Sequence, residues 1–139
     1  NHTSTQAADI DFDSLKGRVV LLDFWASWCG PCRKSFPWMQ QMEDKYKSSG
    51  LTVIAVNLDS DPEMANEFLQ TYEPSFRIEY DPEGVLKDMF GVRAMPTSFL
   101  INREGQVESR QMGFRTSQQD VYEEELHSLL NQKPTKPSQ

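Results

Sequence analysis

The sequence contains few of the residues on which several kinds of protein depend. Only two cysteines and two histidines occur in 139 residues, so a framework of several structural disulfides cannot form and a zinc site has few ligands to draw on. No apolar run approaches the roughly 20 residues that span a bilayer, and the first residues lack the basic and apolar regions of a signal peptide. Basic residues (14) are fewer than acidic ones (21), and the resulting net charge of −7 disfavours nucleic acid or an anionic membrane as a partner.

The length predicts one domain, because a chain of this size buries about two-thirds of its unfolded surface. Apolar residues make up only 37% of the chain and the mean hydropathy is −0.63. Both values are lowered by polar ends, so we expect residues 1–9 and 132–139 to be disordered and residues 10–131 to form the domain. We expect the protein to be a monomer.

The two cysteines lie close together in the segment Trp28-Cys29-Gly30-Pro31-Cys32. An apolar run precedes this segment and a helix-forming stretch follows it. A Cys-x-x-Cys pair between a strand and a helix is typical of redox chemistry, because the two sulfurs can form a disulfide across one helical turn. The start of a helix also favours negative charge on the first sulfur.

Hydrophobic periodicity and turn residues predict an alternation of strands and helices. In chain order we expect a strand at Val19–Trp25, a helix from Pro31 at its first position to about Ser48 with Gly50 as its left-handed end, a strand at Leu51–Asn57, a helix opened by Ser60 or Asp61, a short strand at 76–80, a short helix at 85–90, a hairpin of Ser98–Ile101 and Gln106–Met112, and a last helix capped by Ser117. This order predicts an α/β fold in which helices cover both faces of a mixed central sheet.

Apolar spacing also predicts which helix faces are buried. The expected inward residues are Trp38, Met42 and Tyr46 on the first long helix, Met64, Phe68 and Tyr72 on the second, and Tyr122, Leu126, Leu129 and Leu130 on the last.

Cys29 is the candidate nucleophile because it precedes the helix, whereas Cys32 lies in the first turn and should be more buried. Lowering a thiol pKa from about 8.5 to about 7 requires roughly 2 kcal/mol of thiolate stabilisation. A helix N-terminus supplies at most about that much. We therefore expect a second contribution from a hydrogen bond between the Cys32 thiol and the Cys29 sulfur.

Two other interpretations of the cysteine pair are less favoured. An inert disulfide that closes so short a loop gains little from loop-closure entropy. A zinc half-site would need two more ligands, and the only histidines are His2 near the amino terminus and an isolated His127.

Asp23 is a carboxylate within an otherwise apolar strand, which is unfavourable unless it has partners or a task. We predict that desolvation raises its pKa. The alternative is a frayed strand end at which Asp23 is solvated. Among the aromatic residues, Trp28 is expected to shield the disulfide and line a docking surface, whereas Trp25 and Trp38 are expected to pack in the core.

Three segments resemble the thioredoxin superfamily. The stretch Asp23–Cys32 is similar to the thioredoxin active-site segment, Pro37 matches the proline that kinks the following helix, and Gly91–Thr97 resembles the loop that carries the cis-proline. The resemblance covers roughly Phe12 to Leu130. The segment Phe12–Gly17 before the first strand and the insert Leu51–Phe90 most resemble the TlpA/ResA-like branch.

The resemblance implies a thioredoxin fold with a central insert and a redox-active Cys29–Cys32 disulfide, with no other cofactor and no metal. The Gly30-Pro31 insert tunes the stability of the thiolate. A cis Pro96 lies against the sulfurs without an N–H, and the backbone of Met95 pairs with an extended substrate segment.

The matching acid in thioredoxins relays the proton of the second cysteine through water, a role that falls here to Asp23. The sequence departs from its branch at two positions. TlpA-like members often have asparagine in place of Asp23, and ResA-like members carry glutamate where this chain has Ser35.

The function implied is a thiol–disulfide oxidoreductase that reduces protein disulfides. Its branch consists of exported, often membrane-tethered proteins, so we expect a periplasmic or otherwise extracytoplasmic location, with the cytoplasm as the alternative. The chain begins at Asn1, as expected of a protein trimmed after export or of a cloned fragment. The electron donor would be a membrane thiol reductase of DsbD type, and substrates could include apocytochrome c, as in cytochrome c maturation, or oxidised metallochaperones.

Two rival functions stay open at this point. A thiol peroxidase can be built on the same fold, but such enzymes usually place a lone peroxidatic cysteine elsewhere. A non-catalytic module could bind partners through a groove at Met95–Pro96.

Overall fold

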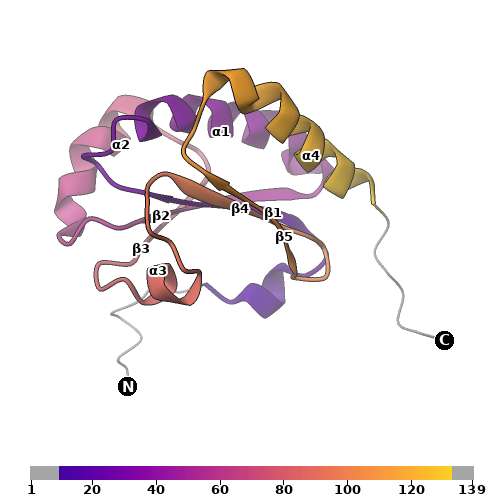
Figure 1. Cartoon of the computed structure of the whole chain (residues 1–139), viewed down its shortest axis with the longest axis horizontal. Helices are drawn as coiled ribbons and strands as arrows, with labels where there is room; N and C mark the ends of the chain where they lie inside the picture. Colours follow the sequence, from indigo (N-terminus) through magenta and orange to yellow (C-terminus); the bar gives the residue numbers. More distant parts are fainter. Residues whose placement is uncertain (1–9, 133–139) are drawn as a thin grey trace.

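The computed structural model describes residues 10–132, in which five strands form one mixed sheet with helices on both faces (Figure 1). The strand order is β3-β2-β1-β4-β5. The strands are β1 (Val19–Trp25), β2 (Leu51–Asn57), β3 (Arg77–Tyr80), β4 (Thr97–Ile101) and β5 (Val107–Met112). β1, β2 and β3 are parallel, whereas β4 runs antiparallel to both β1 and β5. The predicted α/β architecture is confirmed.

The helices divide between the two faces of the sheet. They are α1 (Cys32–Tyr46), α2 (Asn66–Tyr72), α3 (Val85–Met89) and α4 (Gln119–Asn131). Helices α1, α2 and α4 cover one face, and α3 lies on the other together with the 3-10 helix Phe12–Leu15 (Figure 1).

Strand β1 is central and every one of its residues is buried. Successive side chains of a strand point to opposite faces. Leu21 and Trp25 therefore pack in the core under α1 and α4, whereas Leu22 and Phe24 pack in the core on the α3 side. Asp23 occupies the same face as Leu21 and Trp25.

Helix α1 begins at Cys32, with Pro31 just before it as the N-cap, one residue later than predicted. Its end agrees with the prediction, because a 3-10 turn at Lys47–Ser49 finishes at Gly50, whose φ is 113°. A Cβ atom at Gly50 would lie 2.8 Å from a guanidinium nitrogen of Arg103. Glycine is therefore favoured there by backbone conformation, and a larger residue would also displace the Arg103 side chain.

Short 3-10 helices precede two of the α-helices. Of the two predicted caps of the second helix, Ser60 and Asp61, Asp61 is the cap, and it opens the 3-10 helix Pro62–Ala65. This tighter turn has about three residues per turn, so Met64 does not share the buried face of Phe68 and is 54% exposed. Likewise, Ser117 lies inside the 3-10 helix Thr116–Gln118 and makes no capping hydrogen bond to α4.

The predicted inward face of α4 is confirmed, since Tyr122, Leu126, Leu129 and Leu130 are all buried. The segments expected to be disordered, 1–9 and 132–139, lie outside the described residues except for Gln132. Between residues 10 and 132, none of the helices has the length and apolar character needed to cross a membrane.

The topology brings two distant loops together. The cysteine segment leaves the carboxyl end of β1, and the loop that contains Pro96 enters β4 beside that same end, because Thr97 pairs with Phe24. The sheet thereby places both predicted parts of the site at one edge of the molecule.

Candidate active site

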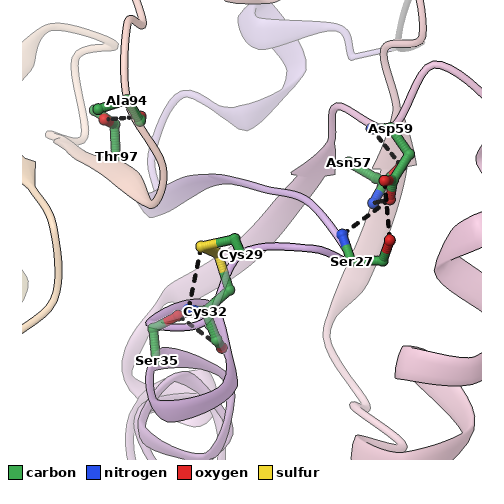
Figure 2. The surroundings of a disulfide bond; sticks show 8 residues. All are labelled: Ser27, Cys29, Cys32, Ser35, Asn57, Asp59, Ala94 and Thr97. Carbon is green, nitrogen blue, oxygen red and sulfur yellow. Dashed lines mark hydrogen bonds between the residues drawn. A yellow bond between two sulfur atoms is a disulfide. The ribbon is translucent and has the colours of Figure 1, made fainter.

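A disulfide joins Cys29 and Cys32, whose Cα atoms are 5.4 Å apart. Figure 2 shows Cys29 in the loop before α1 and Cys32 in the first turn of the helix. The backbone amide of Cys32 donates a hydrogen bond to the Cys29 sulfur at 3.3 Å. Cys29 keeps a small exposed fraction of 4%, whereas Cys32 is fully buried. The predicted difference in burial is confirmed.

This arrangement can stabilise negative charge on Cys29 once the disulfide is reduced. The first amides of a helix have no partner within the helix and attract anions. Here one of them is already directed at the sulfur. The chemistry available is therefore attack on a disulfide by Cys29, followed by attack from the enclosed Cys32.

A buried polar cluster holds the loop before Cys29. The carboxylate of Asp59 accepts hydrogen bonds from the Ser27 amide at 3.0 Å, the Ser27 hydroxyl at 2.9 Å and the Asn57 side chain at 2.8 Å (Figure 2). The Asp59 amide in turn donates to the Asn57 side-chain oxygen at 3.1 Å. This cluster was not predicted from the sequence. The available signal was a carboxylate two residues after the buried strand β2.

Asp23 is 2% exposed, and its Oδ2 atom has no hydrogen-bond partner within the part of the chain that the structure describes. Burial raises the pKa of this carboxyl well above its ordinary value, as predicted. Because β1 continues to Trp25, the alternative of a frayed strand end is wrong. The neighbouring strands place Ala55 and Ser98 beside Asp23.

Ser35 stands where ResA-like sequences carry glutamate. It is buried, and its hydroxyl donates to the Cys32 carbonyl at 3.1 Å (Figure 2). Ser35 therefore supports the first turn of α1 and brings no acidic group to the site.

The peptide bond between Met95 and Pro96 is cis, as the resemblance implied. Pro96 is buried and Met95 is half-buried. The loop is closed by a hydrogen bond of 2.6 Å from the Thr97 hydroxyl to the Ala94 carbonyl (Figure 2). Within the described part of the chain, neither the backbone amide nor the carbonyl of Met95 forms a hydrogen bond. Both therefore remain able to pair with another chain.

The three tryptophans differ in exposure. Trp28 is 66% exposed, and Gly30 and Pro31 are exposed beside it, so these residues form the surface around Cys29. Trp25 and Trp38 are buried. The predicted core packing of these two residues is confirmed.

Comparisons with known proteins agree on one family. A family model described as Redoxin matches residues 1–126. The thiol-disulfide oxidoreductase ResA of Bacillus subtilis (strain 168) is 34% identical over 127 residues, which are 91% of this chain and 68% of the relative. ResA of Oceanobacillus iheyensis is 34% identical over 107 residues, 77% of this chain, and the chain spans only 56% of that relative's length.

Solved structures give the same result. A crystal structure from Chlorobium tepidum, designated a thiol:disulfide interchange protein DsbE, matches with a TM-score of 0.85 and 46% identity, and covers 88% of this chain and 86% of that chain. StoA from Bacillus subtilis matches with a TM-score of 0.66 and 32% identity, over 77% of this chain and 82% of that chain.

Proposed function

Because the chain belongs to the Redoxin family, and within it to the ResA-like thiol–disulfide oxidoreductases of thioredoxin fold, we propose that it reduces the disulfides of protein substrates through Cys29 and Cys32. The observation that carries the proposal is the placement of the disulfide. Cys29 is the more exposed of the two cysteine residues, and the Cys32 amide at the start of α1 is directed at its sulfur.

The reaction proceeds by two thiol–disulfide exchanges. The reduced Cys29 thiolate attacks one sulfur of the substrate disulfide, that bond breaks, and the other substrate sulfur leaves as a thiolate. Cys32 then gives its proton to Asp23 and attacks the Cys29 sulfur. The Cys29–Cys32 disulfide forms, the mixed disulfide breaks, and the substrate departs with both of its sulfurs reduced.

Substrate is held beside the sulfurs by the surrounding surface. Trp28, Gly30 and Pro31 contact the substrate around Cys29, and the unpaired amide and carbonyl of Met95 hydrogen-bond to an extended segment of it. The loop of Pro96 enters β4 beside the end of β1 that leads to the cysteines, and proline has no N–H that would compete for this segment.

The same resemblance supports a location and partners. The protein acts outside the cytoplasm, is reduced again by a membrane thiol reductase of DsbD type, and has apocytochrome c or oxidised metallochaperones among its substrates. Similarity to proteins named ResA and DsbE supports this assignment.

Reduction of insulin disulfides by dithiothreitol tests the activity. We expect the protein to accelerate the reaction, Cys29→Ser to abolish the acceleration, and Ser117→Ala, which removes an exposed hydroxyl far along the chain from the cysteines, to leave it unchanged. No acceleration by the wild type would favour the non-catalytic binding module. Rapid peroxide turnover would favour the thiol peroxidase.

Trapping identifies the partners. Cys32→Ser should stall the reaction at the mixed disulfide, because the second exchange lacks its nucleophile. Covalent partners that are captured by this variant and released by reductant are the substrates, and their compartment is the compartment of the protein. Capture of cytoplasmic proteins alone would contradict the proposed location.

A further inference from the structure

Two buried hydroxyl groups form a pair that the proposed reaction does not use. The Ser98 Oγ and Tyr122 Oη atoms are 2.5 Å apart, and either can be the donor. Both residues are buried. The pair connects β4 to α4, which lies across the sheet face that also carries α1.

The sheet register places this pair beside Asp23. Ser98 is the residue of β4 directly opposite Asp23 of β1. Side chains at opposed positions of antiparallel strands project from the same face, with Cβ atoms about 4.5–5.5 Å apart. Leu21 and Trp25, which share a face with Asp23, pack in the same core as Cys32 and Tyr122. The carboxyl, the hydroxyl pair and the second cysteine therefore occupy one buried layer.

The groups that face Asp23 can be named for each neighbouring element. Strand β2 contributes Ala55 and β4 contributes Ser98, neither of which is charged. On the same side of the sheet, Cys32 of α1 and Tyr122 of α4 belong to one core cluster. Burial raises the pKa of the Tyr122 hydroxyl, the hydrogen bond with Ser98 lowers it in part, and the negative charges of Asp23 and, more weakly, Glu125 raise it further. The Asp23 charge thus acts on the tyrosine end of the pair.

We propose that Ser98 and Tyr122 are positioning residues that stabilise the charged form of Asp23 while it waits for the proton of Cys32. This inference rests on the proposed function. In this state the Tyr122 hydroxyl donates to Ser98, and the Ser98 hydroxyl donates to the Asp23 carboxylate through one bridging water. Oδ2 of Asp23, which lacks a partner in the described chain, is an acceptor for that bond.

Proton transfer reverses the direction of these hydrogen bonds. Cys32 loses its proton to Asp23 and attacks the mixed disulfide, and the neutral carboxyl then donates toward Ser98. Ser98 in turn donates to Tyr122. Hydroxyl groups can exchange these roles because each is both donor and acceptor.

The two buried hydroxyls could be paired simply because each needs a hydrogen-bond partner. That would explain their hydrogen bond but not their position. The pair stands opposite a buried carboxyl whose Oδ2 has no other partner within residues 10–132. The Tyr122 ring is also fixed, because it stacks on Trp38 of α1 with centroids 5.1 Å apart and planes 11° apart. The helix that begins at Cys32 therefore holds the tyrosine in place.

The test removes each hydroxyl with little change in shape, through Tyr122→Phe and Ser98→Ala. Ser98→Thr restores a hydroxyl, and Tyr46→Phe removes a tyrosine hydroxyl that bonds Glu123 instead. One measurement is the titration of the Asp23 carboxyl by NMR in the oxidised full chain. The other is the pH profile of the second exchange, followed by stopped-flow release of nitrothiobenzoate from Cys29.

Tyr122→Phe and Ser98→Ala should each move the Asp23 titration and the pH profile to higher pH. Because a hydrogen bond to a charged group is lost, the second exchange should slow about tenfold near neutral pH, while the first attack by Cys29 keeps its rate. Ser98→Thr should recover most of the rate, and Tyr46→Phe should behave as wild type.

Unchanged titrations and profiles in both hydroxyl-deletion variants would overturn the inference and leave the proposed function intact. A wild-type protein that releases no nitrothiobenzoate would instead contradict the proposed function. The NMR titration would still decide whether Ser98 and Tyr122 act on Asp23.

Discussion

Asp23 illustrates at the scale of one residue how a buried charge links stability to function. An ordinary carboxylate would be ionised at neutral pH, but burial raises the pKa of Asp23 in the folded protein. The folded state therefore binds this proton more tightly than the unfolded state does. The resulting stability is fully present below the unfolded pKa and is lost as pH rises through the folded pKa.

Asp23→Asn should stabilise the oxidised protein at high pH. The substitution removes the ionisation, so the free energy of unfolding should rise by about 1.4 kcal/mol for each unit by which burial raises the pKa of Asp23. Urea unfolding across a pH series measures this difference. It should vanish at pH values below the unfolded pKa of aspartate, and a difference independent of pH would show that Asp23 does not titrate as described.

The sequence was sufficient to identify the residues of the site whose chemistry stands out locally. Cys29 and Cys32 are conspicuous because they are the only cysteines and lie three positions apart, and Asp23 because it is a carboxylate within an apolar strand. Ser98 and Tyr122 are not conspicuous, because serine and tyrosine occur in many cores. Their pairing depends on a strand register and a helix position that bring together residues 24 positions apart.

At the scale of helices, strands and the loops between them, the loops determine how precisely the site is held. Asp59 follows β2, and it accepts three hydrogen bonds that tie the loop before Cys29 to the end of that strand. The carboxylate and its three donors depend on one another, because a buried donor or acceptor that loses its partner destabilises the fold.

Asp59→Ala should lower the free energy of unfolding by about 2–4 kcal/mol, because it leaves the Ser27 and Asn57 donors without an acceptor. Urea unfolding of the oxidised protein measures the loss. Asp88→Ala is the matched control, since the side chain of this aspartate is exposed on α3 and forms, within residues 10–132, only a 3.9 Å ion pair with Lys87. Equal effects of the two substitutions would contradict the structural role of Asp59.

Gly50 ends the 3-10 turn that follows α1, so a substitution there tests how the carboxyl end of this helix is stabilised. Gly50→Ala should destabilise the protein by about 1–3 kcal/mol, because alanine is strained at positive φ and its Cβ would crowd Arg103. Gly30→Ala is the control for stability, since a Cβ there would meet nothing within 4 Å. Thermal unfolding compares the two variants, and equal midpoints would contradict the left-handed backbone conformation of Gly50.

Element boundaries were predicted less well than elements themselves, for a physical reason. Strands β1 and β2 are read directly from continuous apolar runs, because both of their faces are buried. The 3-10 helix Pro62–Ala65 is capped by Asp61 as an α-helix could be, and the 3-10 helix Thr116–Gln118 contains Ser117, a residue type that also caps α-helices. Sequence pattern does not separate the two, so Met64 and Ser117 were assigned wrongly.

Arg103 joins parts of the whole molecule that are far apart in the chain. Its guanidinium donates to the carbonyl of Gly17 at 2.7 Å, of Ser49 at 3.2 Å and of Leu130 at 2.8 Å. These carbonyls precede β1, precede β2 and lie near the end of α4. The side chain thus binds the β4–β5 turn to three other segments, at the end of β1 opposite the cysteines.

Arg103→Ala should lower the free energy of unfolding by about 1–3 kcal/mol, because three hydrogen bonds from a charged donor are lost. Arg103→Lys should recover only part of this, since an ammonium group lacks the planar fork. The exposed Arg93 provides the control substitution, Arg93→Ala. Chemical denaturation gives the values, and an Arg103→Ala variant as stable as Arg93→Ala would contradict the bridging role.

The central claim for the molecule is that the start of α1 stabilises the Cys29 thiolate and leaves it accessible, while Cys32 is enclosed. The most direct measurement is the alkylation rate of the fully reduced protein by iodoacetamide across a pH series, with peptide mapping of the modified cysteine. We predict modification at Cys29, with a midpoint below the value of about 8.5 for a free thiol. Reaction near neutral pH no faster than that of free cysteine, or modification of Cys32 first, would contradict the claim.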